Sequence, residues 1–194
     1  MSQAATTAPI LDLNDIQPAD IIVTRSATPQ SRLIQQGSCA DYSHALLAVY
    51  KGEGIEAVGS GVRKEKLGDL LYEAEAATLY RHTQMNAHFA AWICHYAELQ
   101  RGKKYDTFGA LRSATESGCS PLIGKTQAGF YIQVADNIKA MREGGHDMTF
   151  FCSELVVRAF EAAKLPLVNI AARSATPGAL IKSNYLKLIK ELVL

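Results

Sequence analysis

Residues 42–50 read YSHALLAVY, a nearly continuous apolar run that contains one histidine, His44. A run of this kind is typical of a central strand that is buried on both faces. The turn sequence KGEG follows at 51–54, and IEAV at 55–58 is apolar enough to return as the second strand of a hairpin. The sequence therefore predicts a sheet built around this hairpin, with His44 inside it.

Strand patterns lie mostly before residue 82 and helix patterns mostly after it. Short strands are predicted at 21–24 and 77–81, and helices at 84–101, within 126–142 and from about 150 onward. The pattern at 185–194 fits either a strand or a helix. Early strands followed by helices indicate an α+β fold rather than a βαβ alternation.

Two of the predicted helices have an apolar face that can be read from the sequence. The stripe of the helix at 84–101 has steps of four and three: Met85, Phe89, Trp92, Tyr96 and Leu99. The face of the helix after residue 150 comprises Leu155, Val156, Ala159, Phe160 and Ala163.

The composition narrows the class of protein. The 194 residues carry 20 Lys+Arg and 19 Asp+Glu, so the net charge of +1 gives no electrostatic reason to expect a nucleic-acid or acidic-membrane partner. No apolar run approaches the roughly 20 residues that cross a bilayer, and residues 1–9 lack the pattern of a secretory signal. We expect a flexible tail at 1–9 and a single soluble domain at 10–194.

The four cysteines form no C-x-x-C pair, so reduced and mostly buried thiols are expected at Cys39, Cys94 and Cys119. Cys152 differs because a helix is predicted to begin there, with Thr149 as its N-cap. The free N–H groups and the dipole of a helix N-terminus stabilise a thiolate and lower the pKa of the thiol. The alternative is an ordinary buried helical cysteine.

His44 is the natural partner of such a thiolate, because burying a histidine in an apolar strand is costly unless it has a hydrogen-bonding role. A satisfied core histidine is the alternative. Glu56 lies across the hairpin from residues 47–49, so its contact with His44 requires a diagonal reach or a bulge.

Five short motifs occur in an order that resembles a known family: residues 20–22 (DII), 42–44 (YSH), 55–61 (IEAVGSG), 102–106 (GKKYD) and 151–156 (FCSELV). The series is similar to the permuted, YiiX-like branch of the NlpC-type cysteine hydrolases, within the papain-like superfamily. The resemblance implies a circularly permuted papain-like fold, with an antiparallel sheet packed against helices. The span at about 107–148 is longer than the family's usual connection and is expected to hold an insertion.

The resemblance also implies a role for individual residues. Cys152 matches the nucleophile, His44 the general base, and Glu56 the residue that orients the imidazole. Tyr105 matches a tyrosine whose hydroxyl can join the Cys152 backbone N–H in binding an oxyanion. Tyr42, two residues before His44, is the alternative for that position.

The activity implied by the resemblance is hydrolysis of an amide bond in the stem peptides of peptidoglycan, without a cofactor or metal. Relatives of this branch include antibacterial toxins delivered by type VI secretion. A protein made in the cytoplasm without a signal peptide would then reach the periplasm of a target cell by a non-Sec route; the alternative, which fits the same sequence, is a cytoplasmic enzyme. Its partners would be a secretion carrier and a cognate immunity protein.

Three alternatives remain at this point. The first is lipid or thioester acyl chemistry of the lecithin:retinol acyltransferase type, with an acyl channel lined by residues 130–132 (FYI) and 150–151 (FF). The second is a zinc module that uses Cys39, His44, His146 and Cys152, whose spacing matches no zinc-finger pattern. The third is an inactive hydrolase fold used for binding.

Overall fold

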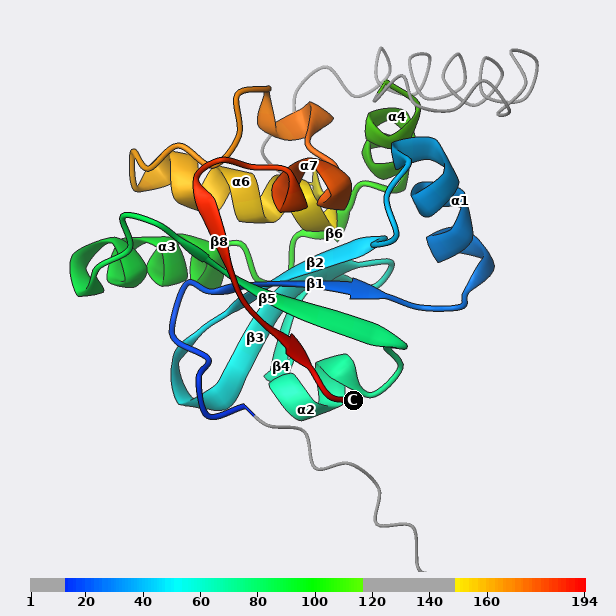
Figure 1. The fold of residues 1–194 in the computed structure, drawn as a ribbon. Helices are drawn as coiled ribbons and strands as arrows, with labels where there is room; N and C mark the ends of the chain where they lie inside the picture. The colour runs from blue at the N-terminus through cyan, green and yellow to red at the C-terminus, as the bar shows by residue number, and fades with distance from the viewer. Residues whose placement is uncertain (1–12, 117–148) are drawn as a thin grey trace, which may run out of the picture.

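The computed structural model describes residues 13–116 and 149–194, and within them an antiparallel sheet of six strands forms the centre (Figure 1). The strand order is β4-β3-β2-β1-β5-β8. The strands are β1 (Ile21–Arg25), β2 (His44–Ala48), β3 (Glu53–Val58), β4 (Gly61–Lys66), β5 (Ala76–His82) and β8 (Leu186–Leu192). The predicted α+β class and its antiparallel sheet are confirmed.

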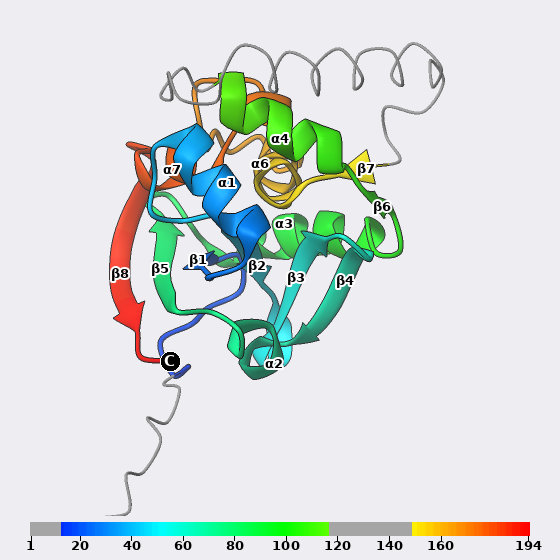
Figure 2. The same ribbon diagram turned by 90° about the vertical axis from the view of Figure 1, so that its right-hand side faces the viewer.

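Helices cover both faces of this sheet unequally (Figures 1 and 2). The helices are α1 (Pro29–Ser38), α2 (Leu67–Leu71), α3 (Ala87–Leu99), α4 (Thr107–Glu116), α6 (Cys152–Ala162) and α7 (Pro177–Ile181). Short 3-10 turns lie at Tyr50–Gly52 and Ala172–Ser174, and β6 (Lys104–Tyr105) pairs in parallel with β7 (Thr149–Phe150). In both views α3 and α6 lie on one side of the sheet and α2 on the other.

The central hairpin forms as the apolar run predicted. Because successive side chains of a strand point to opposite faces, Ala45 and Leu47 join the core cluster under α3 and α6, whereas Leu46 and Ala48 pack with the residues of α2. All four side chains are fully buried. β2 is therefore buried on both faces, and its first residue, His44, lies where the strand emerges from the core.

The helix predicted at 84–101 is α3, but its predicted apolar stripe is wrong in part. Met85, Phe89 and Tyr96 are only partly buried, and 54% of Trp92 and 64% of Leu99 is exposed. The buried face instead comprises Ala90, Ile93, Cys94 and Ala97. Ala90, Cys94 and Ala97 are small, so the helix lies close to the sheet and to α6, and Trp92 and Leu99 are left facing outward.

The helix α6 begins at Cys152, as predicted, but not through the predicted cap. Its N-cap is Phe151, an extended residue without a side-chain hydrogen bond, and Thr149 belongs to β7. Pairing with β6 holds Thr149 in extended form, too far from the first turn to cap it. The predicted apolar face of α6 is buried from Leu155 to Phe160, whereas Ala163 is the partly buried C-cap.

Several sequence predictions concern the remaining stretches. The segment at 185–194 is a strand, β8, and residues 107–116 of the expected insertion form α4, which packs against α1. The tail at 1–9, the helix within 126–142 and the rest of the insertion lie outside the described residues. Within the described ranges, no helix is both long and apolar enough to cross a membrane.

Candidate active site

Cys152 is the first residue of α6, and 3% of it is exposed. The helix packs across β2, which brings the sulfur against the start of that strand. The backbone N–H groups of Ala45 and Ser153 donate hydrogen bonds to the sulfur, and both lower the pKa of the thiol. The structure thus supplies the helix N-terminal environment that favours a thiolate.

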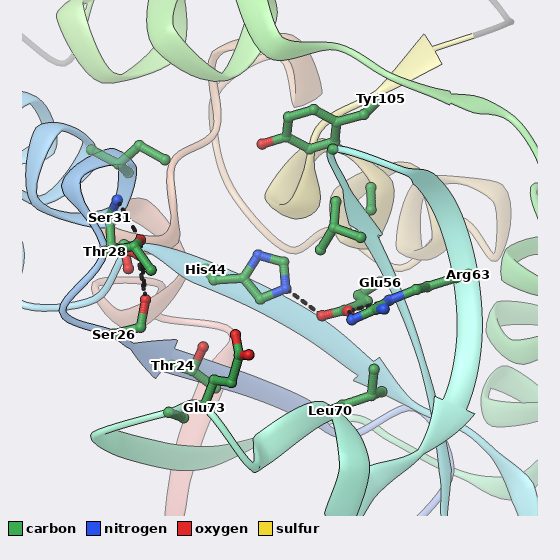
Figure 3. A pocket seen from close by; sticks show the side chains of 16 residues that line it. Thr24, Ser26, Thr28, Ser31, His44, Glu56, Arg63, Leu70, Glu73 and Tyr105 are labelled. Atoms are coloured by element: carbon green, nitrogen blue, oxygen red, sulfur yellow. Dashed lines mark hydrogen bonds and ion pairs between the residues drawn. The ribbon is translucent and has the colours of Figure 1, made fainter.

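His44 is the first residue of β2, and its side chain is 23% exposed. Its Nε2 lies 2.6 Å from Oε2 of Glu56 (Figure 3). The recorded pairing of β2 with β3 ends at Leu47 and Ile55, and one more step would place Leu46 opposite Glu56. Glu56 therefore reaches His44 diagonally, which is one of the two routes that the hairpin arithmetic allowed.

The imidazole and the thiol stabilise each other as a charged pair. Burial opposes a charge on either group. The charge of Cys152 and the hydrogen bonds to Cys152 and Glu56 outweigh burial and raise the pKa of His44 to about 10. The charge and hydrogen bond of His44 lower the pKa of Cys152. Each charged form therefore favours the other, and a thiolate beside an imidazolium is the form in which a cysteine is nucleophilic.

Glu56 completes this arrangement from β3, where only 4% of its side chain is exposed. Burial alone would favour its neutral form, but hydrogen bonds and charge from His44 and then Arg63 outweigh burial and lower its pKa. Arg63 approaches Oε1 of Glu56 with Nε at 2.8 Å and Nη2 at 2.7 Å. Arg63 is not among the site residues predicted from the sequence, because no strand is predicted after the turn at 59–60. The equal spacing of residues 56 and 63 about that turn is the signal that could have identified it.

The structure separates the two candidate tyrosines. Tyr105, on β6, lines the cleft beside His44, and burial followed by the charges of Cys152 and Asp106 raises its pKa. The hydroxyl of Tyr42 is hydrogen-bonded instead to Oγ1 of Thr78, on β5. Tyr105 therefore lies close enough to sense the thiolate, whereas Tyr42 is tied to the sheet.

A cleft of about 190 Å³ opens beside His44. Figure 3 shows Ser26, Thr28 and Ser31 on one side of the imidazole and Glu56 on the other. The three hydroxyls contact one another, with Ser26 Oγ 2.6 Å and Thr28 Oγ1 2.9 Å from Ser31 Oγ. Glu73 adds an exposed carboxylate below His44. These lining residues were not predicted, because nothing in the sequence links the start of α1 to the hairpin.

The zinc hypothesis gains no support from the geometry. In the stretches 13–116 and 149–194, no three His, Cys, Asp or Glu side chains are grouped so that they could hold a metal ion. Cys39 is the exposed C-cap of α1, and its thiol donates to the carbonyl of Gln36 at 3.9 Å. His146 lies outside the described residues, as does Cys119.

Comparison with known proteins identifies a shared fold. No model of a protein family matches the chain, and no curated protein does. Among solved structures, the chain is similar to the crystal structure of metalloprotein YiiX from Escherichia coli O157:H7, DUF1105. The TM-score is 0.62 at 18% sequence identity, and the match covers 90% of this chain and 96% of YiiX. At this identity the likeness establishes the mixed α+β fold of YiiX and leaves the chemistry to the site itself.

Proposed function

We propose that this protein is a cysteine hydrolase that cleaves an amide bond through an acyl-enzyme. The observation that carries the proposal is that Cys152 and His44 shift each other's pKa toward the charged forms, while Oε2 of Glu56 lies 2.6 Å from Nε2 of the imidazole. Perturbed pKa values that arise from a specific partner beside a cleft are typical of a catalytic site. A cysteine that only fills the core does not require a histidine hydrogen-bonded to it.

Each of these residues has a role in the proposed acyl transfer. The Cys152 sulfur attacks the carbonyl carbon, and the resulting oxyanion accepts hydrogen bonds from the Cys152 backbone N–H at the start of α6 and from the Tyr105 hydroxyl. His44 gives its proton to the leaving amine, which departs as the C–N bond breaks. His44 then takes a proton from water, whose oxygen attacks the thioester and releases the acid, which restores the thiolate.

The lining of the cleft favours a polar substrate such as a peptide. Hydroxyls around the start of α1 and the carboxylate of Glu73 offer hydrogen-bonding partners to backbone amides, which a fatty acyl chain cannot use. Phe150 and Phe151, proposed above as walls of an acyl channel, are 3% and 1% exposed and belong to the core. Residues 130–132 lie outside the described ranges.

Within the peptide class, the stem peptides of peptidoglycan are the proposed substrate, and the resemblance to the permuted NlpC-type branch is the support for this choice. The same resemblance supports a toxin that is delivered to the periplasm of a target cell by a type VI machine. A carrier and an immunity protein would be its partners.

Product analysis tests the activity and its substrate together. The protein is incubated with purified peptidoglycan, with a dansylated muropeptide and with phospholipid vesicles, and the products are identified by mass spectrometry. We expect new amine and carboxylate termini in the peptides from wild type and from Cys94→Ala, and none from Cys152→Ala. Release of fatty acid alone would favour the acyltransferase type, and identical products from Cys152→Ala would refute the hydrolase.

A further inference from the structure

The carboxylate of Glu56 is shared between two cations, and each takes a different oxygen. His44 Nε2 contacts Oε2 at 2.6 Å, whereas both Nε and Nη2 of Arg63 contact Oε1. Two N–H groups of one guanidinium on the same oxygen hold that oxygen in place, which leaves the other oxygen for His44. The second oxygen is then aimed at the imidazole.

Arg63 is held in place by the sheet rather than by a loop. β4 pairs with β3 so that Arg63 lies directly opposite Glu56, and this pair sits in the middle of a register of six residue pairs. Cross-strand neighbours of opposite charge are the units that stabilise such a hairpin. The same pairing therefore sets the distance between Arg63 and the catalytic carboxylate.

Arg63 is the cationic side chain that faces Glu56 from β4, in a cleft whose other described titratable groups besides His44 are acidic. The cleft and its surroundings also contain Cys152 of α6, Tyr105 of β6, Asp106 after it, and the exposed Glu73 after α2. Among the described residues that line the cleft, Arg63 is the only lysine or arginine. Without it, a carboxylate that is 4% exposed would face the imidazole alone, and a buried carboxylate with fewer partners takes up a proton more readily.

We propose that Arg63 is a positioning residue: by holding Oε1 of Glu56, it fixes Oε2 against His44 and so keeps the imidazole in the orientation and charge state that Cys152 requires. The inference rests on the proposed cysteine chemistry, although it concerns a residue that touches neither the thiol nor the imidazole. It extends the site to a chain of four side chains that runs from α6 through β2 and β3 to β4.

The test measures the rate of alkylation of Cys152 by iodoacetamide from pH 4 to pH 10, by mass spectrometry of the Cys152 peptide. In Arg63→Met, the midpoint of the plot of alkylation rate against pH should move by about one pH unit upward. The reason is that Glu56, no longer held by Arg63, stabilises the imidazolium less. The kcat at pH 7 on the peptide from product analysis should fall about tenfold, with KM nearly unchanged. Arg63→Lys keeps the charge but not the two-bond geometry, so it should restore part of both losses.

Arg158→Met is the matched control. Arg158 contacts the buried Glu154 at 2.9 Å on α6, and 6% of that glutamate side chain is exposed, so an ion pair of the same kind is lost two residues from Cys152. A merely structural role for Arg63 predicts similar losses of melting temperature and unchanged alkylation profiles in both variants. A role in positioning predicts a shifted profile only for Arg63→Met.

The outcomes separate this inference from the proposed function. Wild-type Cys152 that is alkylated no faster than Cys94 below pH 8 would refute the cysteine chemistry itself. A fast wild-type reaction together with an Arg63→Met profile that overlays it would overturn the role of Arg63 alone. If Arg63→Met does not fold, Arg63→Lys decides: a threefold or greater loss of kcat at constant KM supports the role, and unchanged kcat and profile contradict it.

Discussion

Two buried cysteines lie in helices that pack on the same face of the sheet, and their surroundings give them opposite chemistry. Cys94 is in the middle of α3 and is 2% exposed, and Cys152 begins α6 and is 3% exposed. Burial followed by the charge of Glu98 raises the pKa of Cys94 to about 11. The pKa of Cys152 is lowered although it is equally buried.

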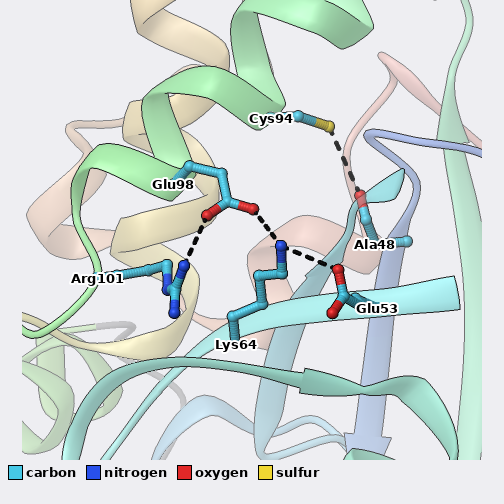
Figure 4. A network of polar contacts seen from close by, with 6 residues as sticks. All are labelled: Ala48, Glu53, Lys64, Cys94, Glu98 and Arg101. Atoms are coloured by element: carbon cyan, nitrogen blue, oxygen red, sulfur yellow. Dashed lines mark hydrogen bonds and ion pairs between the residues drawn. The ribbon is translucent and has the colours of Figure 1, made fainter. Parts of the chain in front are cut away.

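The difference lies in what each helix presents to the sulfur. Cys94 has its helix N–H groups already paired and donates weakly to the Ala48 carbonyl at 3.9 Å (Figure 4). The nearby cations are committed elsewhere: Lys64 bridges Glu98 and Glu53, and Arg101 also contacts Glu98. Burial and the charge of Glu98 thus keep the Cys94 thiol protonated at neutral pH, whereas a helix N-terminus together with His44 lowers the pKa of Cys152 despite its burial.

The substitution His44→Ala should have the largest effect, because it makes the Cys152 site resemble that of Cys94. Without the imidazolium, burial dominates and the thiol holds its proton, so alkylation of Cys152 at pH 7 should fall by about 100-fold or more. Peptide mass spectrometry after a short iodoacetamide pulse measures it. Cys94→Ala is the control and should leave Cys152 as reactive as in wild type; an unchanged rate in His44→Ala would contradict the charged pair.

The site residues were predictable where local patterns carry them. His44 interrupts an apolar run and Cys152 begins an amphipathic pattern, so each could be singled out from one strand or one helix. The hairpin placed Glu56 opposite residues 47–49, so its contact with His44 depended on a diagonal reach or a bulge that the sequence could not decide. The fold class followed in the same way from the order of strands and helices.

What the sequence did not reveal depends on how separate elements meet. The apolar stripe predicted for α3 is wrong in part, because it was built on the largest apolar residues. The face that packs against the sheet and α6 consists mostly of small side chains. The role of Arg63 requires the register of β3 and β4. The choice between Tyr105 and Tyr42 requires knowing that Tyr42 is bonded to β5.

The next largest effect concerns Glu56→Gln, which tests whether the charge behind His44 stabilises the folded protein. The folded pKa of Glu56 lies below its ordinary value of 4.5, so the stabilisation is present above that pH and is lost as the pH falls through the folded pKa. We expect the variant to be about 2 kcal/mol less stable than wild type at pH 7 and the gap to shrink by pH 3.5. Urea unfolding at both pH values measures it.

Glu154→Gln is a control for which the stability difference from wild type should change with pH in the opposite direction. Burial raises the pKa of Glu154 despite its contact with Arg158, so wild type should gain stability relative to this variant as the pH falls. A gap for Glu56→Gln that stays constant from pH 7 to pH 3.5 would show that the carboxylate charge does not support His44 in the fold.

The smallest effect is expected for the two tyrosines. Tyr105 lies near enough to Cys152 for the charge on the sulfur to raise its pKa, and no tyrosine is among the groups that shift the pKa of Cys94. Tyr105→Phe removes a proposed oxyanion donor but leaves the N–H groups of α6, so kcat should fall about tenfold with KM nearly unchanged. Tyr42→Phe loses only the contact with Thr78, which should lower stability by about 1 kcal/mol and leave kcat within about twofold of wild type. Steady-state kinetics on the peptide from product analysis, with melting temperatures for both variants, decides between them. The reverse ranking of kcat would assign the oxyanion to Tyr42, and equal kcat values in both variants would leave it to the backbone of α6 alone.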